Sequence, residues 1–103
     1  MAWLVGHRHI NAVVPRPTPT GGYWEITTCS VIDYPSQMRS IDAKMHSDGS
    51  IELACTMVDH HALAGSLAAL HREIAFTNTP PRARDRMAGS VTDTDVRLLL
   101  PAR

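Results

Sequence analysis

A mixed α/β (α+β) fold, with mostly antiparallel strands and one helix, is predicted for this chain from three observations. Residues 23–32 are rich in aromatic and β-branched side chains, which favour strands. Residues 38–57 contain two alternating runs around an Asp-Gly pair, and residues 62–76 change to the apolar spacing of a helix. With 103 residues, the chain has room for at most one domain and a modest core.

The first elements are expected in the order strand, loop, strand. Residues 2–5 have the apolar side chains of the end of a buried strand. Residues 6–22 contain three prolines at alternate positions, and an extended surface loop is expected there because proline forbids helix and removes ladder donors. Residues 23–32 carry sizeable groups on both faces and are predicted as a central strand. The turn-forming stretch 33–36 ends it.

A β-hairpin is predicted next. Apolar and polar residues alternate over 38–45 and again over 51–57, which is the pattern of two half-buried strands. The connection between them contains Asp48-Gly49, a pair that tolerates the positive φ of a hairpin turn.

The last third of the chain is expected to hold one helix and a short final strand. Four apolar residues in 62–76 fall on one helical stripe, namely Leu63, Leu67, Leu70 and Ile74. Asp59 precedes them as a candidate N-cap or first-turn acid. Residues 77–92 contain Pro80-Pro81 and are predicted as a loop, and 96–100 as a strand.

Composition excludes several classes of protein. Hydrophobic residues make up 44% and charged residues 19%, which indicates a globular chain rather than a disordered one. Ten basic and ten acidic side chains give no formal net charge. An excess of positive charge that would attract nucleic acid or an anionic membrane is therefore not expected. The arginines of 82–86 are interrupted by Asp85 and are interpreted as a solvated loop.

No apolar run approaches the ~18 residues of a membrane span. The compartment is undetermined, with the cytoplasm as the default expectation.

The two cysteines leave two interpretations open. Cys29 and Cys55 both fall in apolar or alternating runs, as buried thiols in neighbouring strands would. A disulfide between them remains an alternative, although the spacing does not resemble that of a secreted cysteine scaffold.

His7 and His9 are the leading candidates for chemistry. They follow the apolar run and Gly6, and side chains at i and i+2 of an extended segment point to the same side. Two neutral imidazoles placed in this way can bind one metal ion or two adjacent ones. The competing interpretation is a pair of solvent-exposed loop histidines.

Other polar residues are weighed as secondary candidates. Asp59-His60-His61 is interpreted as a helix N-terminus or as a further metal-binding group. His46 and His71 are interpreted as surface residues. Glu25, Asp33 and Tyr34 surround the predicted central strand, where a catalytic carboxylate pair and ordinary solvent-facing or turn-forming roles are both considered.

A run of collinear segments resembles actinobacterial metallophosphoesterases of the calcineurin-like superfamily. Trp3–Asn11 is similar to their strand and Gly-His-Thr-His–Arg-Asn segment. Further similar segments are Gly22–Thr28 (Gly-Phe-Trp-Glu-Ile-Asn-Thr in that group), Ile32–Gln37 (Ile-Asp-Trp-Pro-Gln-Gln), Thr56–His60 and Leu67–Glu73. The resemblance covers roughly residues 3–76 and extends loosely to 96–100.

This resemblance implies a fold and a site. Residues 1–103 would be the C-terminal part of a four-layer α/β/β/α sandwich domain. His7 would bind one divalent ion and His9 its neighbour in a Mn, Fe or Zn pair that acts on a phosphate-ester substrate. Asn11 is a candidate substrate contact. Arg8 replaces the family's small hydroxyl residue and either contacts a phosphate oxygen or points to solvent.

The same resemblance implies that the ligand set is incomplete. The family's Asp-x-His, Gly-Asp and Gly-Asn-His-Asp/Glu ligand motifs and one further histidine precede the Gly-His-x-His segment, and residues 1–5 contain none of them. The chain is therefore expected to be inactive as a hydrolase by itself. The alternative is a non-catalytic remnant or a small binding protein. If the chain is such a part of a sandwich, an apolar sheet face is left uncovered, and self-association through that face is expected.

Overall fold

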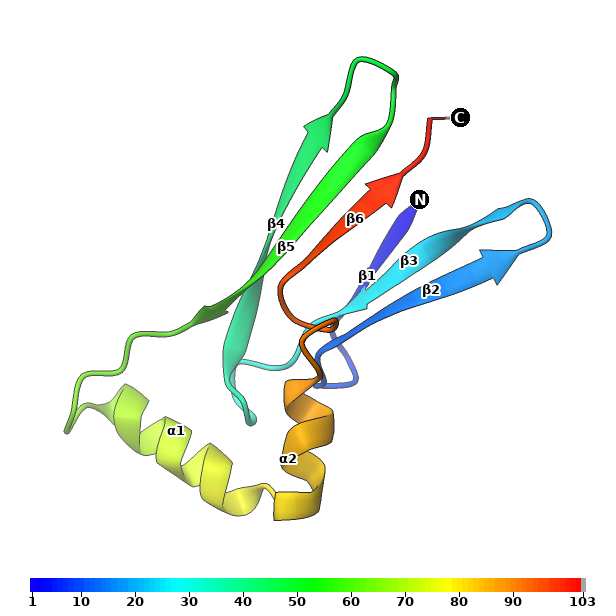
Figure 1. Cartoon of the computed structure of the whole chain (residues 1–103). Coiled ribbons are helices and arrows are strands. Elements are labelled where there is room, and N and C mark those ends of the chain that lie inside the picture. Colours follow the sequence, from blue (N-terminus) through cyan, green and yellow to red (C-terminus); the bar gives the residue numbers. More distant parts are fainter. Residues whose placement is uncertain (103) are drawn as a thin grey trace.

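The computed structural model describes residues 1–102, which form two three-stranded sheets and two helices (Figure 1). The elements in chain order are β1 (Ala2–Val5), β2 (Ala12–Thr18), β3 (Gly21–Thr27), β4 (Gln37–Met45), β5 (Ile51–Asp59), α1 (Leu67–Asn78), α2 (Pro81–Ala88) and β6 (Val96–Leu100). The strand orders are β1-β3-β2 and β4-β5-β6. Among the strands of residues 1–102, β1 and β3 form the one parallel pair. The predicted mixed class with mostly antiparallel strands is confirmed.

The two sheets face each other across a small shared core. Its buried members are Ile26 of β3, Leu53 and Cys55 of β5, and Leu98 of β6. Partly buried apolar side chains from both sheets pack against them, including Val13 and Ile41. The central strands β3 and β5 therefore supply most of the core, as expected for strands with neighbours on both edges.

Strand β2 corrects the predicted loop over 6–22. Ala12–Thr18 pairs antiparallel with β3, and the register places Pro15 opposite Trp24 and Pro17 opposite Gly22. The Val13 amide, which lies on the same edge as the two proline nitrogens, donates to the Asp93 carboxylate at 2.9 Å rather than to β3. Alternate prolines are compatible with an edge strand when their nitrogens face away from the neighbouring strand.

The predicted hairpin and final strand are confirmed, and the predicted central strand is shorter than expected. β4 and β5 pair over nine residues each around the Asp48-Gly49 turn, where Gly49 has a φ of 82°. β3 is central in its sheet but ends at Thr27 instead of residue 32. Residues 28–36 are irregular because they cross from one sheet to the other.

The first helix begins later than predicted. α1 spans Leu67–Asn78 instead of 62–76, because Gly65 adopts a φ of 77° and Ser66 is the N-cap. The Ser66 hydroxyl accepts a hydrogen bond from the Ala69 amide at 3.2 Å. The predicted cap, Asp59, is the last residue of β5, and its carboxylate accepts a hydrogen bond from Gln37 at 2.9 Å.

The predicted loop over 77–92 is wrong, because α2 occupies Pro81–Ala88. Proline at the first helical position lacks only an amide that has no partner there, and its fixed φ suits a helix start. Pro80-Pro81 therefore separates two helices rather than excluding helix. Gly89 ends α2 with a φ of 78°.

Both helices lie beyond one end of the sheets rather than over their outer faces (Figure 1). Three members of the predicted apolar stripe lie on α1, namely Leu67, Leu70 and Ile74, and all three are exposed. Leu63 is also exposed and precedes the helix. Trp3 and Leu4 of β1 are also about three-fifths exposed (60% and 62%). Within residues 1–102, neither helix has both the length and the apolar character that crossing a membrane requires.

Acid is expected to weaken the fold through Asp93. Burial alone would raise the pKa of this carboxyl, but hydrogen bonds from Ser90 and from the Val13 amide hold the pKa below its ordinary 3.8. Its contribution to stability is therefore present above pH 3.8 and is lost as pH falls below that value toward the folded pKa. Urea unfolding at pH 7 and at about pH 3 should show a smaller pH-dependent loss for Asp93→Asn than for the parent chain. An equal loss would contradict this assignment.

Candidate functional site

The histidine turn, residues 6–9, leaves the sheet directly after β1. The His9 amide donates to the Gly6 carbonyl at 3.4 Å, which closes the turn. His9 itself has a φ of 52°, a left-handed conformation that is uncommon for a residue other than glycine. The predicted extended segment is therefore a turn, so the strand alternation that would place both imidazoles on the same side does not apply here.

His9 is anchored by a carboxylate from another part of the chain. Its Nδ1 lies 2.5 Å from Oδ2 of Asp33, and the two side chains are 42% and 45% exposed. Asp33 belongs to the segment between β3 and β4. A carboxylate on one ring nitrogen fixes the orientation of the imidazole and leaves Nε2 as the nitrogen for any further ligand. The same pairing is common for histidines that bind metal ions.

His7 and Arg8 are exposed at the tip of the turn. Within the described part of the chain, neither side chain has a hydrogen-bond partner or an ion pair. Both predicted roles of Arg8, phosphate contact and solvent exposure, are compatible with this position. The sequence-predicted pair is thus placed on one short turn, with one imidazole held and the other unconstrained.

Asn11 is buried, with 2% of its surface exposed. Its Nδ2 donates to Oε1 of Gln37 and to the Ala88 carbonyl, each at 3.2 Å, and its Oδ1 accepts from the Cys29 amide at 3.0 Å. The Asn11 amide donates to the Met87 carbonyl at 3.0 Å. All of these partners are groups of the protein itself. Asn11, the predicted substrate contact, therefore joins several segments of the chain by hydrogen bonds.

Three histidines converge on the segment 31–36. His9 binds the Asp33 side chain, His60 Nδ1 lies 3.1 Å from the Ser36 carbonyl, and His71 Nε2 lies 3.1 Å from the Ile32 carbonyl. The three imidazoles come from the histidine turn, from the residues after β5 and from α1. His60 and His71 were interpreted as a helix-terminal and a surface residue, and the structure gives both a role in holding this segment.

The carboxylates considered for acid–base work have separate partners. Glu25 accepts two hydrogen bonds at 3.1 Å from the Arg16 guanidinium, and these bonds hold the pKa of Glu25 below its ordinary value. Asp33 is bound by His9. Glu25 and Asp33 thus bind different basic side chains on different segments. They do not form the catalytic carboxylate pair that was considered.

The described residues do not form a complete metal site by themselves. Among residues 1–102, no three His, Cys, Asp or Glu side chains converge as a metal site would need. The histidine turn offers at most two imidazoles, while divalent ions in proteins take four or more ligands. We therefore derive no reaction step through a metal ion for this chain alone.

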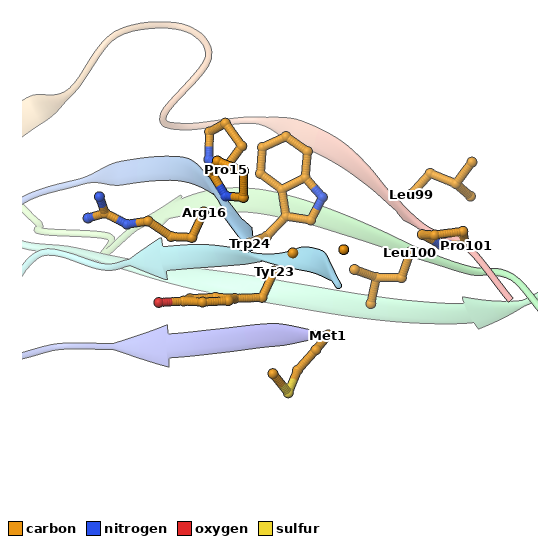
Figure 2. A pocket seen from close by; sticks show the side chains of 11 residues that line it. Met1, Pro15, Arg16, Tyr23, Trp24, Leu99, Leu100 and Pro101 are labelled. Atoms are coloured by element: carbon orange, nitrogen blue, oxygen red, sulfur yellow. The ribbon is translucent and has the colours of Figure 1, made fainter. Parts of the chain in front are cut away.

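An apolar hollow lies at the opposite end of β1 from the histidine turn. It measures about 430 Å³ and opens between the β2–β3 hairpin and β6, where Trp24 and Leu100 lie on facing strands (Figure 2). Met1 is part of its lining, whereas Gly6 begins the histidine turn beyond Val5. The two features are therefore separate sites.

Both cysteines are free and buried. Burial raises the pKa of both thiols above the ordinary value. Cys29 follows β3 in one sheet and Cys55 lies within β5 of the other. Of the two interpretations, the structure has the buried thiols and not the disulfide, and Cys29 lies just outside a strand.

Comparisons with family models, with curated proteins and with solved structures find no match for this chain. The resemblance to metallophosphoesterases therefore depends on the sequence segments themselves, and the activity that it implies stays a prediction.

Proposed function

We propose that the chain is the histidine-bearing C-terminal part of a metallophosphoesterase-type hydrolase. In this proposal His7 and His9 are two ligands of a divalent-metal site that other residues complete, and the chain alone does not hydrolyse phosphate esters. The substrate class of the complete site is a phosphate ester, and Mn, Fe or Zn are the candidate ions.

The observation that carries the proposal is the contact between His9 and Asp33. A carboxylate 2.5 Å from Nδ1 leaves Nε2 as the coordinating nitrogen and keeps the ring in one orientation. The exposed position of His7 two residues earlier adds a second imidazole on the same turn. One oriented imidazole and one exposed imidazole on the same turn support the assignment of both as metal ligands.

Metal titration tests the proposal directly. The purified chain is expected to bind Zn²⁺ weakly by isothermal titration calorimetry. His7→Ala and His9→Ala should each lower that affinity about ten-fold or more. Asp33→Asn should lower it about ten-fold, because removal of an orienting partner costs about 10–100-fold in metal affinity.

The matched control is His61→Ala. His61 is exposed and, within residues 1–102, makes no side-chain hydrogen bond, so the variant should bind Zn²⁺ as the parent does. Zn²⁺ affinity that is unchanged in both His7→Ala and His9→Ala would refute the ligand assignment. Turnover of p-nitrophenyl phosphate with Mn²⁺ that His7→Ala abolishes would refute the inactivity of the isolated chain.

A non-catalytic binding protein is the second candidate function. It is favoured by α1, where Leu67, Leu70 and Ile74 lie at the spacing of one helical face and are 85%, 52% and 49% exposed. Contiguous exposed apolar surface is typical of protein interaction sites. In the same titration, this alternative predicts no Zn²⁺ binding that depends on His7 or His9.

A further inference from the structure

Strand β4 has an open edge that is long and regular. Within the described residues, 1–102, it pairs with β5 alone, over nine residues, and forms one edge of the β4-β5-β6 sheet. Figure 1 shows the β4–β5 hairpin projecting away from both helices. Unpaired amides and carbonyls on such an edge are a template for another strand.

The backbone groups that face outward can be assigned from the hairpin. The His46 amide donates to the Ser50 carbonyl at 2.9 Å, so the even-numbered residues of β4 direct their amides toward β5. Hydrogen bonds of an antiparallel pair come from alternate residues. Ile41, Ala43 and Met45 therefore present their amides and carbonyls outward, where within residues 1–102 they meet no other backbone group.

The side chains of this edge are complementary to themselves in one register. If two copies pair antiparallel about Ala43, Ile41 of one copy is opposite Met45 of the other. The pairs 43–43, 41–45 and 45–41 are then hydrogen-bonded pairs. Asp42 faces Lys44 of the second copy twice, in the closely spaced non-hydrogen-bonded positions.

Neighbouring registers lack this complementarity. Pairing about residue 42 would place the two Asp42 carboxylates opposite each other, and pairing about residue 44 would do the same for the two Lys44 side chains. Like charges directly opposite destabilise a strand pair. Pairing about Ile41 would set Lys44 against Met38 and leave Asp42 without a basic partner.

From this edge we propose that the chain forms a homodimer in which two β4 strands pair antiparallel about Ala43. The β4-β5-β6 sheets of the two copies then form one continuous six-stranded sheet. Met45, which is 74% exposed in the single chain, packs against Ile41 of the second copy on the core-side face. The proposal does not depend on the metal-site proposal, since β4 carries none of its residues.

The other edges are less suited to self-pairing. β2 carries Pro15 and Pro17, whose nitrogens cannot donate. β1 has four residues and β6 has five. The sequence of β6, Val-Arg-Leu-Leu-Leu, contains no acidic residue to face Arg97 of a second copy.

Sedimentation velocity tests the dimer and its register together. At about 100 µM the parent chain is expected to sediment as a dimer that dissociates on dilution, because a strand-pair interface is small. Asp42→Lys and Lys44→Asp should each raise the dissociation constant about ten-fold or more, because each converts both facing pairs to like charges. The double variant Asp42→Lys/Lys44→Asp should regain the parent affinity.

Mixing the two single variants gives a test that a folding defect cannot imitate. Positions 42 and 44 are both positively charged in Asp42→Lys and both negatively charged in Lys44→Asp. The mixture is therefore expected to form a heterodimer with two opposite-charge pairs, although each variant alone sediments as a monomer. Ala43→Pro provides an independent check, since it removes the central outward amide and should give a monomer. Circular dichroism should show that each variant keeps its sheet content.

Several results would overturn the proposal. A parent chain that stays monomeric at about 100 µM would do so. A dimer that none of the β4 variants weakens, but that Leu70→Ser disperses, would place the contact on the exposed face of α1 instead. A mixture of the two single variants that stays monomeric would refute the register.

Discussion

Replacing Asn11 with alanine is expected to lower the free energy of unfolding by about 2–4 kcal/mol. The side chain is 2% exposed and bonds Gln37, the Ala88 carbonyl and the Cys29 amide. Alanine leaves two backbone groups, the Ala88 carbonyl and the Cys29 amide, without this partner. Each unsatisfied buried group costs about 1–3 kcal/mol. Urea denaturation followed by circular dichroism measures the loss.

Asn78→Ala is the matched control for this experiment. Asn78 is the exposed last residue of α1 and, in the part of the chain that the structure describes, makes no side-chain hydrogen bond. The same substitution there should change stability by no more than about 0.5 kcal/mol. If Asn11→Ala were equally neutral, Asn11 would be free for the substrate contact that the metallophosphoesterase resemblance implies, and the structural role assigned to it would be wrong.

Local signals in the sequence predicted those elements that are fixed locally. The β4–β5 hairpin follows from strict alternation around Asp48-Gly49, and β6 from a short apolar run before Pro101. The start of α1 also had a local signal, Gly65-Ser66, which is a turn residue followed by a preferred N-cap. The wider apolar stripe beginning at Leu63 outweighed it in the prediction.

The elements that the sequence analysis missed depend on their neighbours. Pro15 and Pro17 rule out an interior strand, yet they permit an edge strand whose nitrogens face away from β3, and only the pairing with β3 decides between strand and loop. Pro81 likewise permits either a break or a helix start. In both cases proline restricts where an element can begin or pair and does not exclude the element.

The local part of the candidate site was predicted from the sequence, and its long-range contacts were not. His7 and His9 were found by their spacing, which is local. The Asp33 partner of His9 lies 24 residues along the chain, and the contacts of His60 and His71 with the segment 31–36 span 24 and 39 residues. No sequence period links such positions, because they meet only when the two sheets and α1 are assembled.

Arg39 had a signal that the sequence analysis did not use. It shares the inward-facing side of β4 with Ile41 and Ala43, and a charged residue at such a position needs buried partners. Its guanidinium donates to the carbonyls of Asp93 and Thr94 at 2.6 Å and of Thr27 at 3.4 Å, and to the Thr28 hydroxyl at 3.3 Å. One side chain of β4 thus joins the end of β3 to the segment that leads into β6.

Arg39→Ala is therefore expected to lower the free energy of unfolding by about 3–5 kcal/mol, since it removes several charge-assisted hydrogen bonds at once. Arg39→Lys should recover at most half of the loss, because one ammonium group cannot reproduce the planar fork of donors. Arg82→Ala, on the exposed surface of α2, should stay within about 0.5 kcal/mol of the parent. Urea denaturation of the three variants measures these free energies of unfolding. Full rescue by lysine would mean that Arg39 acts through its charge alone. Equal stability of Arg39→Ala and Arg82→Ala would mean that other contacts hold the two sheets together.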